Sequence, residues 1–280
     1  MTATASSSFA ATSADPADRY LALDGARLRY RDEGRGPPVI LVHGWTLDLE
    51  MWQPQIAALK DAFRLVRFDR RGHGLSSGRP DTGRDVTDLA ALLRHLNLNR
   101  VSLIGMSQGA RAVLAFAGAA PSQVSAIILD GPPSMQFARG EDVPLGEFAR
   151  LVQSQGIEAF RREWARRPLM QLRTRDARTR ALLAAMIERY PGTDLTYPAA
   201  CETQAEPALR LESIIAPALI LLGEHDVPSR AQSAQLLCAR LQSAERAAIA
   251  DAGHLPNLDR PDVYSDLCRA FLARHASARA

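Results

Sequence analysis

The sequence predicts an α/β fold in which a doubly wound, mostly parallel sheet carries an inserted helical lid. Three observations lead to this class. Short apolar runs of strand length recur along the chain, and segments with apolar residues every three or four positions lie between most of them. The interval between Asp130 and Pro217 contains no convincing strand and is rich in helix-forming sequence. In such a fold we expect ligands to bind beyond the carboxyl ends of the strands.

A hairpin and six further strands are predicted in order. RYLAL and ARLRYRD flank Asp24-Gly25, a dipeptide that favours a type I′ turn because both residues tolerate positive φ. The other strands are apolar runs without polar alternation, which is typical of strands covered on both faces. These runs are PPVILVH, FRLVRFD, RVSLIGM, VSAIILD, PALILLG and ERAAIA. Core helices are predicted at VTDLAALLRHL, RAVLAFAGAA, SAQLLCARL and DVYSDLCRAFLARH.

The chain divides into a tail, a core in two pieces and a lid. Residues 1–18 are rich in Ser, Ala and Thr without periodicity, which predicts a disordered tail. Residues 19–131 and 213–280 form the predicted α/β core, and residues 132–212 form the helical lid. Lid helices are expected at LGEFARLVQSQ, GIEAFRREWARR and ARTRALLAAMIERY, with Pro or Gly between them.

Composition excludes several classes of protein. The 280 residues carry 34 basic and 31 acidic side chains, a net charge of only +3, so a nucleic-acid partner is not expected. Three cysteines, Cys201, Cys238 and Cys268, are far apart and match neither a disulfide framework nor a zinc site. No leader-like start and no apolar run of about 20 residues is present, so we expect no membrane association and a cytoplasmic location. The oligomeric state stays open.

A candidate nucleophile lies where a predicted strand meets a predicted helix. Gly105-Met106-Ser107-Gln108-Gly109 joins RVSLIGM to RAVLAFAGAA. Glycine on both sides removes the β-carbons that would block a strained turn, and such a turn presents the serine hydroxyl at a helix N-terminus. The strand-turn-helix context makes this pattern a strong indication of a catalytic serine.

A serine hydroxyl needs a base, which is normally a histidine held by a carboxylate. Asp226 follows the run LILLGEH, and His254 follows the next predicted strand, so both are expected at carboxyl ends of adjacent strands. The order Ser107, Asp226, His254 is the one expected when this triad is built on a parallel sheet. Asp130, at the end of another strand, is the alternative acid for the same imidazole.

Two backbone amides are expected to stabilise the oxyanion that forms during acyl transfer. One belongs to Gln108, directly after the serine, and the other to Trp45, which follows His43-Gly44 at the end of a strand. His43 is interpreted as a structural turn residue. Asp69, Arg71 and His73 are expected to brace the loop after their strand.

With these motifs, the chain from Arg19 through its last helix resembles the α/β-hydrolase fold superfamily. HGWTLDLEMW resembles the oxyanion segment of pimeloyl-ester carboxylesterases. FDRRGHGLSSGRP resembles the D-x-R-G-x-G-x-S segment common in lactonases and esterases of this fold, enol-lactonases included. The resemblance implies a hydrolase that uses neither a metal nor an organic cofactor.

Two further likenesses keep an alternative reaction open. Phe160, Trp164 and Pro168-Leu169, with Arg111, are similar to the menaquinone-pathway enzyme that eliminates pyruvate from a succinyl-cyclohexadiene carboxylate, and that enzyme binds carboxylates with arginines. The cofactor-free quinolone dioxygenases share H-G-W and R-G-H-G-L-S, but their histidine before the serine is Met106 here.

The sequence therefore predicts a serine hydrolase that cleaves a small carboxylic ester or lactone through an acyl-serine intermediate. Trp45, Met106, Arg111 and Trp164 are predicted to contact substrate, although Trp164 in a purely structural role fits the sequence equally well. Eight arginines between Arg161 and Arg180 oppose only Glu163 and Asp176. They form either an exposed helical face or a basic lid that attracts a carboxylate-bearing substrate.

Overall fold

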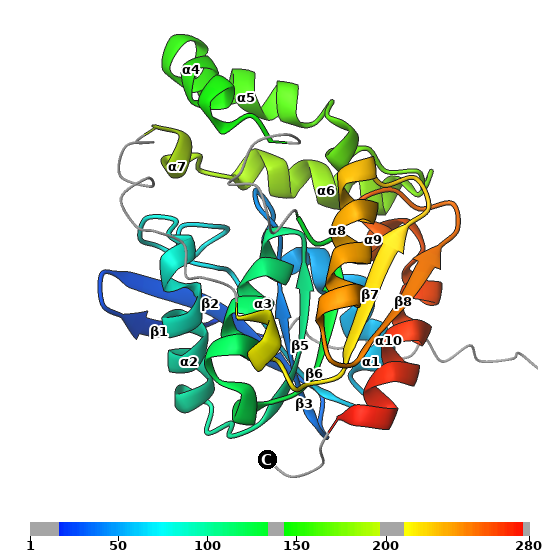
Figure 1. Cartoon of the computed structure of the whole chain (residues 1–280). Helices are drawn as coiled ribbons and strands as arrows, with labels where there is room; N and C mark the ends of the chain where they lie inside the picture. Colours follow the sequence, from blue (N-terminus) through cyan, green and yellow to red (C-terminus); the bar gives the residue numbers. More distant parts are fainter. Residues whose placement is uncertain (1–16, 134–142, 197–209, 277–280) are drawn as a thin grey trace, which may run out of the picture.

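An eight-stranded sheet forms the centre of the molecule (Figure 1). The computed structural model describes residues 17–133, 143–196 and 210–276. The strand order is β1-β2-β4-β3-β5-β6-β7-β8; β2 pairs antiparallel with β1 and β4, and every other pairing is parallel. The strands are β1 (Arg19–Leu23), β2 (Ala26–Glu33), β3 (Pro38–Val42), β4 (Arg64–Phe68), β5 (Val101–Met106), β6 (Val124–Asp130), β7 (Ala218–Gly223) and β8 (Ala244–Ile249). The predicted fold class is confirmed.

Helices cover both faces of this sheet. One apolar cluster joins α1 and α10 to the sheet, and a second joins α2, α3 and α8 to the opposite face. Because both faces are covered, β3, β5, β6 and β7 are buried along their whole length. The helices are α1 (Gln53–Leu59), α2 (Asp85–His95), α3 (Gln108–Ala119), α4 (Leu145–Gln155), α5 (Ile157–Trp164), α6 (Ala177–Arg189), α7 (Thr193–Thr196), α8 (Pro228–Arg240), α9 (Pro256–Asp259) and α10 (Pro261–His275). Short 3-10 turns lie at Leu49–Trp52, Thr82–Arg84, Pro121–Gln123, Pro168–Met170 and Leu211–Ser213.

Two expectations about the strands are wrong. β8 was expected to be covered on both faces, but it is the edge of the sheet and most of its residues are partly or fully exposed. The hairpin turn has only one left-handed residue, Gly25 at φ 67°, whereas a type I′ turn requires two. Asp24 is absent from the left-handed residues of the described chain, so glycine alone supplies the positive φ.

Helices α4 to α7 lie beyond the carboxyl ends of the strands, in the interval where the sequence predicts a lid (Figure 1). We call residues 143–196 the lid segment. Of the predicted tail, residues 1–16 are outside the described part of the chain, whereas Asp18 forms ion pairs with Arg29 and Arg31. No helix within the described ranges has both the length and the apolar character needed to cross a bilayer. Cys238 and Cys268 are free thiols, and Cys201 is not among the described residues.

Candidate active site

Ser107 lies in a strained turn between β5 and α3. Its backbone angles, φ 51° and ψ −116°, are left-handed values that a non-glycine residue rarely adopts. A β-carbon on Gly109 would lie 2.2 Å from the Val42 carbonyl oxygen, and one on Gly105 would lie 2.4 Å from the Gly109 oxygen. The two glycines therefore allow the close approach that the turn requires. The Ser107 amide is fixed by donating to the Asp130 carbonyl oxygen at 2.7 Å.

His254 and Asp226 meet beyond the ends of β7 and β8. The imidazole Nδ1 lies 2.9 Å from Oδ2 and 3.0 Å from Oδ1 of Asp226. Both side chains are almost completely buried, 2% and 3% exposed. In the neutral ring, an Nδ1–H that donates to the carboxylate leaves Nε2 as the proton acceptor. This tautomer is the one that a general base needs.

Asp130, the alternative acid, does not take this position. It ends β6 and is fully buried, and in the described part of the chain its carboxyl group neighbours the Tyr264 hydroxyl and forms no hydrogen bond to His254. Burial, followed by the neighbouring charge of Asp226, raises the pKa of Asp130 well above its usual value. Burial therefore favours the neutral form of Asp130, whereas the Asp226 carboxylate is the one that contacts the imidazole of His254.

A tight turn after β3 brings Gly44, the residue before Trp45, against Ser107. A β-carbon on Gly44 would lie 3.4 Å from Cβ of Ser107 and 2.7 Å from Sδ of Met106. Thr46 in the same turn has a left-handed φ of 63°. The backbone amides of Trp45 and Gln108 donate to no acceptor in the described part of the chain. Two predicted oxyanion donors thus lie on turns that contact each other.

His43 holds this turn in place and does not face the triad. Its Nε2 accepts a hydrogen bond from the Arg70 amide at 2.8 Å, and its Nδ1 donates to the Gly44 carbonyl at 2.7 Å. Burial, with the charges of its neighbours as a smaller cause, keeps the pKa of His43 well below its usual value, so the ring stays neutral. Asp69 accepts from the Leu49 and Leu75 amides, each at 2.8 Å, which matches its predicted bracing of the loop.

The lid segment is attached to the same turn. The Trp45 ring packs against four aromatic rings of the lid segment, with centroid distances of 5.0 to 6.3 Å. These rings belong to Phe148, Phe160, Trp164 and Tyr190. Trp164 Nε1 donates to the Thr46 hydroxyl at 2.7 Å, and Trp45 Nε1 donates to Asp194 at 2.8 Å. Trp164 therefore joins lid and core in addition to lining a pocket.

Two pockets adjoin the turn that carries Ser107, and Trp45 lines both of them. The first is small, about 20 Å³, and is mostly apolar; its lining includes Ser107, His254 and Trp45 together with Leu47, Met106, Val143, Trp164, Leu169 and Met170. The second is polar and has a volume of about 350 Å³; its lining includes Trp45 and Gln108. Of the predicted substrate contacts, Trp45, Met106 and Trp164 line the small pocket.

The remaining predicted contacts lie elsewhere. Arg111, on α3, lines neither pocket. None of the eight arginines from Arg161 to Arg180 lines either pocket; Arg161, for example, bonds to Glu158 and to the Tyr190 carbonyl. These positions favour the exposed-face interpretation of the lid arginines.

Two structural residues were missed by the sequence reasoning. Asp259 accepts from the Gly253 amide at 2.8 Å and from the Arg173 and Thr174 amides at 2.7 and 2.9 Å, so it ties the His254 loop to the lid segment. Gly131 at φ 50° lets the chain pass close to the imidazole, because a β-carbon there would lie 2.9 Å from Cε1 of His254. Their sequence signals are an aspartate shortly after the histidine and a glycine directly after a strand.

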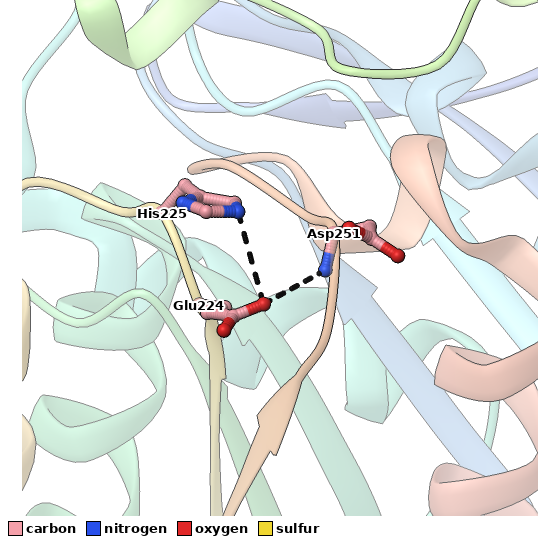
Figure 2. A group of neighbouring side chains, drawn as sticks. All are labelled: Glu224, His225 and Asp251. Atoms are coloured by element: carbon pink, nitrogen blue, oxygen red, sulfur yellow. Dashed lines mark hydrogen bonds and ion pairs between the residues drawn. The ribbon is translucent and has the colours of Figure 1, made fainter.

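Among the residues that the structure describes, one set of potential metal ligands is present, and it lies on the surface. Figure 2 shows Glu224, His225 and Asp251, whose candidate ligand atoms lie within 4.8 Å of one another. All three side chains are exposed, and the Glu224 carboxylate already pairs with His225 at 3.7 Å and accepts from the Asp251 amide at 3.2 Å. Contacts within the group account for its arrangement.

Comparisons with known proteins agree with this geometry. A family model described as the alpha/beta hydrolase fold matches residues 37–261. The chain is 31% identical over 270 residues to a protein of Bacillus subtilis named "Putative 2-succinyl-6-hydroxy-2,4-cyclohexadiene-1-carboxylate synthase", covering 89% of this chain and 96% of that one. It is 27% identical over 255 residues to 3-oxoadipate enol-lactonase 2 of Acinetobacter baylyi, covering 85% and 89%. A thermophilic esterase from Thermogutta terrifontis with malate bound superposes with a TM-score of 0.79 at 26% identity, covering 94% of this chain and all of that one.

Proposed function

Because the chain belongs to the alpha/beta hydrolase family, we propose that it cleaves a small carboxylic ester or lactone through an acyl-serine intermediate. The observation that carries the proposal is the pairing of His254 with Asp226 beside the pocket that Ser107 also lines. The named esterase and enol-lactonase relatives add support at the level of hydrolysis.

The proposed reaction has two halves. His254 Nε2 takes the proton of the Ser107 hydroxyl while Oγ attacks the carbonyl carbon, and the amides of Trp45 and Gln108 donate to the oxyanion. The tetrahedral intermediate collapses as His254 returns the proton to the leaving alcohol, leaving an acyl-serine. Water then attacks the acyl-serine with His254 as base, and the acid leaves. Asp226 keeps the imidazole in the required tautomer and stabilises the imidazolium.

The experiment is a pair of measurements on wild-type protein and Ser107→Ala. Wild type is expected to hydrolyse p-nitrophenyl acetate and butyrate and to form one phosphonate adduct on Ser107, detected by mass spectrometry. Ser107→Ala is expected to lower kcat by several orders of magnitude and to give no adduct. Survival of most activity in the variant would rule out the acyl-enzyme.

A second candidate is favoured by the 31% identical relative from Bacillus subtilis. It is a lyase that uses the same pocket, with His254 acting as a base that forms a substrate carbanion. Pyruvate release from the menaquinone intermediate, without ester hydrolysis or a phosphonate adduct, would select it. Oxygen uptake with a hydroxyquinolone would select the dioxygenase alternative.

A further inference from the structure

The polar pocket beside Gln108 has no part in the chemistry proposed so far. It adjoins the two residues whose amides are the proposed oxyanion donors, and its volume of about 350 Å³ is ample for a short acyl group. Its lining is formed by the hairpin turn, the loop after β4, the first turns of α2 and α3, and α7. The lining residues that matter for charge are Arg70, Arg71, Arg79, Arg84, Asp24, Asp81, Asp85 and Asp194.

A hydrogen bond from Arg70 fixes the orientation of the Gln108 carboxamide. Arg70 Nη1 donates to Gln108 Oε1 at 2.6 Å, and Arg70 is itself held by Asp85 through contacts of 2.7 and 3.1 Å. Arginine has only hydrogen-bond donors, so the carboxamide must direct its oxygen to Arg70, and its Nε2 then points away from Arg70. Nε2 donates to no acceptor in the described part of the chain, so it is available to a ligand in the pocket.

The charges around the pocket do not select an ion. Of the described residues, four arginines and four aspartates line it, so the formal charges of this part of the lining cancel. His73 in the same lining adds no charge near pH 7, because burial, followed by the charge of Arg70, lowers its pKa to about 4. A carboxylate would lose its hydration there without a net positive field to compensate it, whereas a neutral acceptor loses much less.

The position of His254 decides which part of an ester enters which pocket. The proton donor to the leaving alcohol must be next to that oxygen, and His254 lines only the small apolar pocket of the two. A volume of about 20 Å³ is little more than one water molecule needs, so this pocket has room for the alcohol oxygen and the atoms next to it. The acyl chain must then extend to the other side of the carbonyl, along Trp45 and Gln108.

We propose that the polar pocket is the acyl subsite, and that the Gln108 carboxamide donates a hydrogen bond to a neutral acceptor, such as a ketone oxygen, carried by the acyl chain. The inference rests on the proposed ester hydrolysis and makes it specific. Gln108 then has two separate roles: its backbone amide serves the oxyanion and its side chain selects the substrate.

Three methyl esters of matched shape test this assignment: methyl pentanoate, methyl 4-oxopentanoate and monomethyl succinate, which present a methylene, a neutral ketone and a carboxylate. Proton release in a pH-stat gives kcat/KM. Wild type is expected to prefer the keto ester to each of the other two by about tenfold, the effect of one neutral hydrogen bond. Gln108→Met and the isosteric Gln108→Glu, which both lack the donor, are expected to bring the ratio of keto ester to pentanoate close to one. Gln235→Met, an equivalent change on the exposed face of α8, is the control and keeps the wild-type ratio.

The inference is overturned if Gln108→Met and Gln108→Glu keep the wild-type ratio of kcat/KM for the keto ester over the pentanoate ester. It is also overturned if wild type prefers the succinate ester. Binding separates this failure from failure of the proposed function. In the Ser107→Ala background, calorimetry is expected to show tighter binding of the keto ester than of pentanoate, and Gln108→Met added to this variant is expected to abolish the difference. If no ester is hydrolysed but this difference holds, the proposed hydrolysis fails and the subsite stands; if the difference is absent, the subsite fails.

Discussion

Replacing Asp226 by Asn tests the relation between the imidazole and its carboxylate. In the wild type, two contacts of 2.9 and 3.0 Å join Nδ1 to a carboxylate that is 3% exposed. During the reaction the ring becomes an imidazolium, and at an effective dielectric constant of about 20 and a charge separation of about 4 Å the attraction is worth about 4 kcal/mol. That energy corresponds to about a thousandfold in rate. Asparagine can also donate to Nδ1 and so favour the wrong tautomer, which extends the expected loss in kcat to about ten-thousandfold.

Steady-state hydrolysis of p-nitrophenyl butyrate at pH 7.5 measures the loss, and KM is expected to change little because Asp226 does not line either pocket. Asp130→Asn is the matched control. Asp130 forms no hydrogen bond to His254 in the described part of the chain, and burial raises its pKa toward the neutral form that asparagine matches in shape, so kcat is expected to stay within tenfold of wild type. The reasoning is refuted if Asp226→Asn keeps more than a tenth of the activity, or if Asp130→Asn loses as much as Asp226→Asn does.

Three further predictions concern the scaffold. Gly109→Ala is expected to lower the free energy of unfolding in urea by about 3 kcal/mol, because its β-carbon would lie 2.2 Å from a backbone oxygen; unchanged stability would contradict the close approach. His73 has a pKa of about 4 in the folded protein, against about 6.5 in the unfolded chain. As the pH falls from 6.5 to 4, this histidine gains a proton only in the unfolded chain, so the free energy of unfolding falls by up to about 3 kcal/mol. Urea unfolding at pH 7 and 4.5 measures this, and His73→Asn is expected to flatten the dependence; an equal slope in the variant would assign the acid sensitivity to other groups. Trp164→Phe is expected to cost about 1 kcal/mol in urea unfolding through loss of its hydrogen bond to Thr46, and no change would show that the bond contributes nothing net.

The fold could be predicted because its signals are local. Apolar runs of strand length and apolar spacing of helix length identify most elements within a few residues, and helix α4 begins and ends at the predicted residues. The edge position of β8 could not be predicted in this way. Its AERAAI sequence is apolar enough to be a buried strand, but only the strand order decides that no neighbour covers it, and strand order is a long-range property.

In the candidate site, too, local sequence predicts some features, and others depend on the three-dimensional arrangement. Ser107 is marked by its glycines, and the strand ends predict where Asp226 and His254 fall. The sequence favours Asp226 as the acid but leaves Asp130 as an alternative, since both lie at ends of strands that meet the same edge of the sheet. The choice depends on position, because both carboxylates are buried: Asp130 lies beside the Tyr264 hydroxyl, whereas Asp226 lies against the imidazole. The polar pocket was beyond sequence reasoning because its charges come from four separate segments.

The position of Trp45 links substrate selection to the rate of the chemical step. Its backbone lies in the turn that is proposed to hold the oxyanion, while its side chain lines both pockets and packs against four rings of the lid segment. A shift of the lid aromatics therefore moves the same turn, and catalytic hydrogen bonds lose much of their value when a donor is displaced by an ångström. Thr46 in the same turn has a left-handed backbone conformation and accepts a hydrogen bond from Trp164, which gives the lid segment a second contact with this turn. Substitutions in the lid aromatics should accordingly act on kcat as well as on KM, because the lid supports the turn that stabilises the transition state in addition to enclosing the substrate.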